Sequence, residues 1–247
     1  MKYTNKYKLP RSIVDAVQKN TYDLSQTDQN IVSVTTLINP PIIRQLSIRH
    51  WNDVEEDVAD NLWRLMGSAI HEVLSRISED GRFIEERLKE PISGMTIAGR
   101  PDLYDIQEKS IEDYKLTSVW AVKYTKTEWE QQINYYAWFF RKLEFEVLTG
   151  YINALLRDWR RGEYLKNPKT YPMVPFKRIP VKLWSFETQC KHIEERIKAH
   201  QAVRNIPDEQ LPICTKAERW NKDVRCKEYC PVNKFCPYYI FTYMKDE

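Results

Sequence analysis

A predicted β-hairpin constrains this chain more than any other part of its sequence. Two extended segments, 102–106 and 111–117, are separated by the polar turn Gln107-Glu108-Lys109-Ser110. Runs of β-forming residues joined by a short polar loop are typical of two antiparallel strands. Pro101 precedes the first segment, which suits a strand start because proline cannot donate a hydrogen bond to a neighbouring strand.

The hairpin brings three charged side chains together. With 107–110 as the loop, Asp102 lies opposite Lys115 and Tyr104 lies opposite Asp113. Side chains alternate between the faces of a sheet, so Asp102, Asp113 and Lys115 share one face. A one-residue slip in register would separate them. Two carboxylates and an ammonium can hold a divalent cation beside a phosphodiester; the alternative interpretation is a cross-strand ion pair on a solvated face.

A helix is predicted before the hairpin, over 61–77. Gly67 and His71 lie one turn apart within it, and the glycine costs a helix about 1 kcal/mol relative to alanine, which favours a close backbone approach there. His71 is either a buried core histidine or an imidazole ligand for a metal. The apolar residues at helical spacing are Leu62, Leu65, Met66, Ala69, Ile70, Val73, Leu74 and Ile77.

A second helix is predicted after the hairpin, over 127–145. Gln132 and Tyr136 are four residues apart and therefore share a face, which Phe140 and Leu143 continue. A packed aromatic stripe explains most of this face. The amide of Gln132 still needs a polar partner within it.

The order of these motifs resembles a known family. The order resembles that of the RecB-type branch of the PD-(D/E)XK nuclease superfamily. The motifs are, in order, Gly67-x-x-x-His71, Pro101-Asp102, Asp113-x-Lys115 and Gln132-x-x-x-Tyr136-Ala137. The resemblance is close over about residues 60 to 140, and the surrounding sequence is similar to bacteriophage-encoded exonucleases of this group. It implies a restriction-endonuclease-like α/β core, in which helices flank a mixed central sheet.

The resemblance also implies roles for individual residues. Lys115 would orient the attacking water and stabilise negative charge, while Gln132 and Tyr136 would position Lys115 or the DNA backbone. Hard oxygen donors suit a small divalent cation that keeps waters of its own. The implied ligands of Mg²⁺ or Mn²⁺ are His71, Asp102, Asp113 and the backbone carbonyl of Tyr114. The implied catalytic residues are Asp102, Asp113, Lys115, Gln132 and Tyr136.

A cysteine group near the C-terminal end forms the second candidate site. Clustered thiols in a chain without a recognisable signal peptide indicate metal ligation rather than disulfides. The spacing Cys-x3-Cys-x5-Cys differs from paired CxxC zinc sites and resembles the cysteine triplet of CRISPR-associated RecB-like nucleases that carry a [4Fe–4S] cluster. The cysteines concerned are Cys214, Cys226, Cys230 and Cys236.

The chain departs from that family at the fourth cluster ligand. The family places a cysteine before the nuclease core, but the matching segment, 34–43, contains none. Cys214 is the candidate replacement. The first alternative is that the cysteines bind Zn²⁺ instead of a cluster. The second is that they are free thiols with no cofactor. Cys190 lies in the predicted helix 186–203 and is interpreted as a small, buried apolar residue.

Chain length and composition are compatible with this assignment. The 247 residues, 42% of them hydrophobic, can bury the core of a single domain. We expect one nuclease domain, 1–247, with three parts: a helical N-terminal part at 1–60, the nuclease core at 61–205 and a cysteine-rich tail at 206–247. No apolar run reaches the roughly 18 residues that span a membrane, so a cytoplasmic location is expected, in the host cytoplasm if the protein is viral.

Local basic clusters, rather than net charge, would have to contact DNA. The formal net charge is only +3, too small to indicate a nucleic-acid partner by itself. Candidate clusters are Arg157–Arg161, Lys123 with Lys126, and Lys177-Arg178. For each cluster the alternative is a solvated surface.

The remaining segments alternate between helix and strand. A short helix is predicted from Leu9-Pro10-Arg11-Ser12, and Ser33 is a candidate N-cap before a helix interrupted at Pro40-Pro41. The further predictions are helices over roughly 50–90 with a break near Gly81, a strand at 147–157, a loop at 160–175, a strand at 176–184 and a helix at 186–203.

The sequence therefore predicts a Mg²⁺- or Mn²⁺-dependent deoxyribonuclease. An exonuclease or end-processing role in recombination or replication of a phage or mobile element is expected, with DNA and a recombination or replication protein as partners. The first alternative is a DNA-binding member of the superfamily without catalysis. The second is a scaffold whose metal-stapled C-terminal tail contacts a partner.

Overall fold

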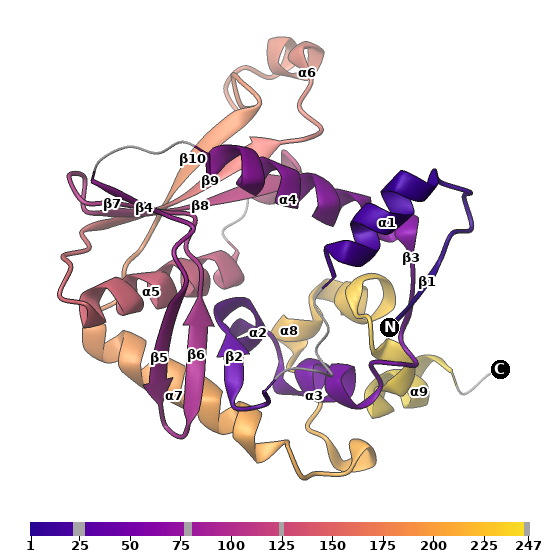
Figure 1. Cartoon of the computed structure of the whole chain (residues 1–247). Helices are drawn as coiled ribbons and strands as arrows, with labels where there is room; N and C mark the ends of the chain where they lie inside the picture. Colours follow the sequence, from indigo (N-terminus) through magenta and orange to yellow (C-terminus); the bar gives the residue numbers. More distant parts are fainter. Residues whose placement is uncertain (22–27, 77–80, 124–125, 245–247) are drawn as a thin grey trace. The chain divides into compact units, whose positions relative to one another are not determined.

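The computed structural model describes residues 1–21, 28–76, 81–123 and 126–244 (Figure 1). The chain divides into two compact units. Unit 1 comprises Met1–Leu62, Ser93–Met95 and Glu194–Glu247, and unit 2 comprises Trp63–Ile92 and Thr96–Ile193. Within the described ranges, no helix is long and apolar enough to cross a membrane.

A five-stranded mixed sheet forms the centre of unit 2. Its strand order is β10-β9-β8-β7-β4, with β8 and β9 parallel and the other pairs antiparallel. The predicted mixed sheet is confirmed, as are strands near 147–157 and 176–184. The strands are β4 (Arg82–Ile84), β7 (Leu103–Asp105), β8 (Ser110–Thr117), β9 (Thr149–Leu156) and β10 (Phe176–Val181).

The β7–β8 hairpin exists, but its predicted register is wrong by two residues. Tyr104 pairs with Ile111, not with Asp113, and Asp105 pairs with Ser110. The turn is 106–109, because Asp105 accepts the backbone N–H of Glu108 at 2.9 Å and so closes the loop earlier. A shift of two leaves every side chain on its predicted face, since strand side chains alternate with a period of two.

Helix α5 (Thr127–Lys142) packs on this sheet, and its residues Gln132 to Phe140 are all buried. Gly150 in β9 permits the contact: a Cβ there would lie 2.5 Å from Ile133 Cγ2. Tyr104 stacks on Phe140 with ring centroids 4.1 Å apart. The predicted helix 127–145 is therefore confirmed, although Leu143 lies beyond its end and is exposed.

The rest of unit 2 corrects two sequence predictions. Residues 82–84 and 88–92 are strands rather than parts of a helix, after a turn at Gly81 with φ +85°. The predicted loop 160–175 contains the short helix α6. Helix α4 confirms the helix predicted over 61–77 as far as Leu74, and Ile77 lies outside the described residues. The elements concerned are α4 (Leu62–Leu74), β5 (Leu88–Ile92), β6 (Met95–Gly99), α6 (Arg161–Lys166) and α7 (Phe186–Ala202), whose first half belongs to this unit.

Unit 1 is built mainly from short helices around an apolar core. Ser33 caps α2 by accepting the Thr36 N–H, as predicted, and the chain breaks before Pro41 starts α3. The core consists of Ile42, Leu46, Val54, Val203, Leu211 and Val232. The elements are β1 (Lys2–Thr4), α1 (Arg11–Lys19), β2 (Ile31–Ser33), α2 (Val34–Ile38), α3 (Pro41–Arg49), β3 (Glu55–Asp57), the second half of α7, α8 (Lys216–Arg219) and α9 (Pro237–Tyr243), with β1 and β3 paired in parallel.

Candidate active site

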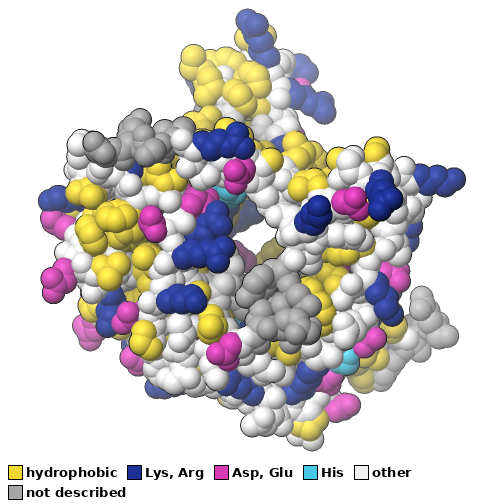
Figure 2. All heavy atoms as spheres, in the orientation of Figure 1, with side chains coloured by type: hydrophobic (Ala, Val, Ile, Leu, Met, Phe, Trp, Pro, Cys, Tyr) yellow, Lys and Arg dark blue, Asp and Glu magenta, His cyan; other side chains and the backbone are white. Residues whose placement is uncertain are grey.

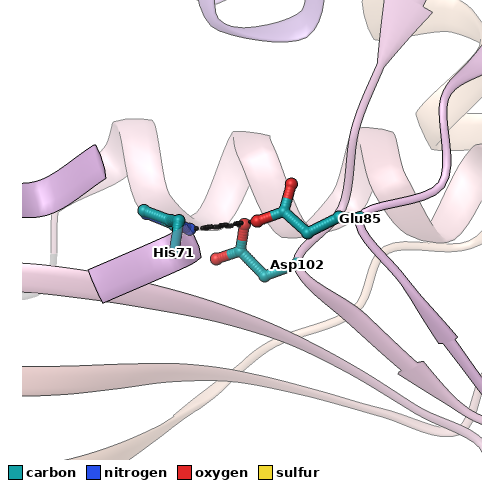
Figure 3. A group of neighbouring side chains, drawn as sticks. All are labelled: His71, Glu85 and Asp102. Carbon is teal, nitrogen blue, oxygen red and sulfur yellow. Dashed lines mark ion pairs between the residues drawn. The ribbon is translucent and has the colours of Figure 1, made fainter. Parts of the chain in front are cut away.

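Three potential metal ligands meet where α4, the segment after β4 and the start of the hairpin approach one another. His71 Nδ1 lies 3.1 Å from an oxygen of Asp102 and 3.4 Å from an oxygen of Glu85. Their donor atoms all lie within 4.8 Å of one another. Figure 3 shows the three side chains pointing toward a common centre. This is a metal-sized group of one imidazole and two carboxylates.

Asp102 also connects this group to strand β8. Its second oxygen accepts the backbone N–H of Tyr114 at 2.6 Å, so both carboxylate oxygens have a partner, and the residue as a whole is buried. In a strand, the N–H and C=O of one residue point toward the same neighbouring strand. The carbonyl of Tyr114 is therefore directed toward the Asp102 edge of β8.

Asp113 is buried on the face of β8 that α5 covers. Gln132 Nε2 donates to one of its oxygens at 3.0 Å, and Lys115 Nζ lies 2.7 Å from the other. Burial raises the pKa of Asp113, the charge of Lys115 opposes this shift, and the negative charge of Asp102 adds to it. The carboxylate therefore gains from any additional positive charge in the site.

The two polar residues of α5 form a short relay behind Asp113. Gln132 also donates to the hydroxyl of Tyr136 at 3.1 Å, as expected for residues four apart on one face. Burial, followed by the charge of Asp113, raises the pKa of Tyr136, so its hydroxyl stays protonated. The relay contacts Asp113 directly, and its role in positioning Lys115 or DNA remains a prediction.

His71 is strongly basic in the absence of a metal. Its hydrogen bonds to Asp102 and Glu85 raise its pKa to about 10, against the opposing effect of burial. A neutral imidazole is required for metal ligation, so a cation binding here would displace this proton. His71 is therefore neither a neutral core histidine nor solvent-exposed.

These residues fit a small divalent cation. A pocket beside them is lined by His71, Glu85, Asp102 and Tyr114, among others. One buried oxygen of Asp113, the one nearest Lys115, accepts no hydrogen bond of regular geometry from the residues that the structure describes, so it keeps lone pairs for a ligand. Asp113 does not belong to the group of three donors found among the described residues, and its role as a ligand of the same ion remains a prediction.

Glu85 is a site residue that the sequence did not reveal. It lies in a segment predicted to be helical, and its backbone adopts φ +54°, a left-handed conformation that costs energy for a non-glycine residue. Its backbone N–H donates to the carbonyl of Asp102 at 3.2 Å, and Arg100 forms an ion pair with its second oxygen. These contacts aim the carboxylate at His71.

Gly67 does not have the role predicted for it. A Cβ at this position would meet no atom within 4 Å, so none of the described residues outside α4 approaches its backbone closely there. The glycine leaves an open stretch on the same helix as His71.

The four C-terminal cysteines lie apart from this site, in unit 1. All four border one pocket, together with Ile42 and Ile43 of α3. Burial raises the pKa of Cys214 to about 12 and that of Cys230 to about 11, and neighbouring thiols contribute. No three of their sulfur atoms form a metal-sized group within the described part of the chain. The remaining cysteines of the group are Cys226 and Cys236.

Cys190 is half-buried rather than fully buried. Its sulfur accepts the indole N–H of Trp138 at 3.3 Å. The prediction of a small apolar core residue is therefore correct only in part, since the sulfur also serves as an acceptor.

The basic clusters have different surroundings. Arg178 stacks on Tyr151 at 3.7 Å and forms an ion pair with Glu112, so protein groups engage it. Arg161 starts α6, which lies between strands β9 and β10. Figure 2 shows Lys and Arg side chains beside hydrophobic ones in this region. Arg157 and Lys126 each lie over a tryptophan ring.

The mixed α/β fold and the potential metal ligands His71, Glu85 and Asp102 are typical of metal-dependent phosphodiesterases. The sequence model described as the PD-(D/E)XK nuclease superfamily matches residues 42–237, most of the chain, and the protein belongs to this superfamily. No curated protein matches the sequence. Among solved structures, the crystal structure of SSO0001 is similar in fold, with a TM-score of 0.58 at 16% identity, covering 92% of this chain and 97% of that one.

Proposed function

We propose that this chain is a Mg²⁺- or Mn²⁺-dependent deoxyribonuclease with a restriction-endonuclease-like core of the RecB type. The observation that carries the proposal is the shared contact network of Asp102, Asp113 and Lys115. Asp102 accepts a hydrogen bond from the backbone N–H of Tyr114. The two residues that flank Tyr114, Asp113 and Lys115, form an ion pair with each other. A solvated ion pair would not require a carboxylate that is 1% exposed, as Asp113 is.

Each residue has a defined task in this proposal. His71, Asp102, Asp113 and the Tyr114 carbonyl would hold the cation, which would supply Lewis-acid chemistry for the attacking water and positive charge for the phosphate. Lys115 orients the attacking water through its ammonium and stabilises negative charge on the non-bridging oxygens. Gln132 fixes the rotamer of Asp113 and is itself held against Tyr136.

The sequence resemblance further supports an exonuclease or end-processing role in recombination or replication of a phage or mobile element. A panel of linear duplex, circular and single-stranded DNA, incubated with Mg²⁺, Mn²⁺ or EDTA, tests this role. We expect metal-dependent loss of linear DNA and survival of circular DNA. Cleavage of closed circles would indicate an endonuclease. DNA binding without cleavage of any substrate would favour the non-catalytic alternative.

We also propose that the four C-terminal cysteines bind a [4Fe–4S] cluster. Their shared pocket supports the proposal, because Cys214 borders it beside Ile42 and Ile43. These isoleucines lie in or next to the segment where the family places its missing ligand. This shared lining supports Cys214 as the replacement for that ligand.

Anaerobic purification tests the cofactor. A brown protein with stoichiometric iron and sulfide is expected, whereas a colourless protein with one zinc would redirect the assignment. Cys230→Ser should lower the melting temperature, because a bound cofactor stabilises only the folded tail. Cys190→Ser is the matched control outside the group. Metal-free protein with unchanged melting in Cys230→Ser would contradict ligation.

A further inference from the structure

Tryptophan rings on unit 2 lie beside cationic side chains. Arg157 lies over Trp63, 4.2 Å from the ring centroid, Lys126 lies 4.8 Å from that of Trp129, and Lys123 lies 5.5 Å from that of Trp120. Trp63 is 51% exposed and Trp120 is 63% exposed. An exposed indole presents a flat apolar face on which a planar ligand group can stack.

The parallel pair β8 and β9 explains why two of these pairs lie close together. Thr117 is paired with Leu156 where both strands end, and Arg157 N–H donates to the carbonyl of Thr117 at 2.9 Å. Just beyond, the N–H of Val119 donates to Asp158 at 2.7 Å. Arg157 and Trp120 therefore leave the same edge of the sheet, the carboxyl end at which open α/β sheets place their ligands.

Helix α4 links this edge to the candidate active site. Trp63, Gly67 and His71 are spaced by four residues and lie along one face of the helix. A Cβ at Gly67 would meet no described atom within 4 Å, so the described residues leave room beside the helix midway between the indole and the imidazole. A chain lying along this face would reach His71.

The electrostatics of Lys126 connect the same surface to Lys115. Desolvation lowers the pKa of Lys126, and the positive charges of Arg157 and Lys115 lower it further, against the opposing effect of Glu128. Three cations close enough to repel one another favour an anionic ligand between them. The charge of Lys115 acts on Lys126, so an anionic chain bound at Arg157 and Lys126 would lie near the candidate active site.

From these contacts we infer that Trp63, Arg157, Lys126 and Trp120 form a stacking surface that binds single-stranded DNA and leads it to the active site. This inference rests on the proposed nuclease function and adds a substrate class to it. Exposed indoles stack on unpaired bases while cations follow the phosphates, an arrangement suited to single strands. In a duplex the bases are already stacked on one another, so the tryptophans would gain no partner.

Fluorescence anisotropy with a labelled oligodeoxythymidine, in EDTA to prevent cleavage, tests the surface. Trp63→Ala and Arg157→Ala are each expected to weaken binding by about tenfold. Arg157→Ala should also reduce the slope of log affinity against log salt by about one. Trp63→Phe should retain most of the affinity because it keeps an aromatic face. Binding of a blunt hairpin duplex should change little in all of these variants.

Arg178→Ala is the matched control, since Arg178 also stacks on an aromatic ring, Tyr151. It pairs with Glu112, whose side chain points to the opposite sheet face from Asp113. Its affinity for the oligonucleotide should equal that of the parental protein. Parental affinity in both Trp63→Ala and Arg157→Ala, with folding verified by circular dichroism, would overturn the stacking surface.

The outcomes also separate this inference from the proposed function. If the parental protein cleaves duplex DNA with Mg²⁺ but the two substitutions leave oligonucleotide binding unchanged, the nuclease stands and the stacking surface falls. If the substitutions weaken binding while the parental protein cleaves no DNA, the surface stands and the nuclease assignment falls.

Discussion

The carboxylate of Asp102 accepts a hydrogen bond from the backbone N–H of Tyr114 at 2.6 Å. This bond fixes the start of the hairpin against β8 at the residue between Asp113 and Lys115. The other oxygen of Asp102 lies 3.1 Å from His71. The Asp102 side chain thus joins the Pro101-Asp102 and Asp113-x-Lys115 motifs to the helix that carries His71.

Glu85 is expected to contribute to metal affinity. Its carboxylate belongs to the group of donors around His71, so Glu85→Gln should raise the Kd for Mn²⁺ by roughly tenfold or more. Electron paramagnetic resonance of free Mn²⁺ measures this directly, without DNA or turnover. Glu86→Gln changes the adjacent exposed residue and should leave the Kd unaltered. An unchanged Kd in Glu85→Gln would exclude it from the site.

Binding of Mn²⁺ is expected to release a proton from His71. The pKa of about 10 means that the metal-free imidazole is protonated at pH 8, whereas ligation requires it to be neutral. The affinity should therefore increase as the pH rises toward 10. Titration calorimetry in two buffers of different ionisation enthalpy should give different apparent enthalpies. Equal enthalpies would show that His71 keeps its proton and is not a ligand.

The same hydrogen bonds should stabilise the metal-free fold in a defined pH range. Because the folded pKa of His71 exceeds the usual value of 6.5, the stabilisation is complete below about pH 6.5 and is lost as the pH rises through about 10. His71→Gln should flatten this alkaline decline in urea unfolding experiments. A decline of equal size in the variant would assign it to other groups.

His200 in unit 1 is expected to cause acid sensitivity. Burial lowers its pKa to about 4, and the positive charge of Arg196 contributes. The unfolded chain binds a proton below about pH 6.5 and the folded protein does not, so stability should fall between pH 6.5 and 4, by roughly 2 kcal/mol.

Replacing His200 separates this effect from general acid unfolding. His200→Gln keeps a donor for the carbonyl of Leu37, which the imidazole contacts at 3.2 Å, but cannot titrate. Urea unfolding at pH 7 and pH 4.5 should show a smaller loss for this variant than for the parental protein. His192→Gln, at a half-buried position of the same helix, is the control. Equal losses in the parental protein and His200→Gln would contradict the assignment.

The sequence predicted which sheet face the candidate residues share better than it predicted the hairpin register. The hairpin register was wrong, yet Asp113 and Lys115 kept their face because the error was two residues. The alternation of side chains tolerates such an error, while an error of one would have removed the site. Gln132 and Tyr136 could be paired in advance because helical spacing alone determines that contact.

Glu85 and the tryptophan contacts could not be predicted in the same way. The orientation of Glu85 depends on a left-handed backbone and on Arg100, fifteen residues away in sequence. The contact between Trp63 and Arg157 joins a helix to the end of a distant strand. Neither feature leaves a periodic pattern, because both arise only when separate elements pack together.

Cleavage of linear DNA by Lys115→Ala and Asp113→Ala, with Mg²⁺ or Mn²⁺, tests the central claim most directly. Both variants should fold normally and lose metal-dependent cleavage, while Lys109→Ala, in the turn of the same hairpin, should cleave at the parental rate. A folded Lys115→Ala protein that degrades DNA as fast as the parental protein would contradict the account.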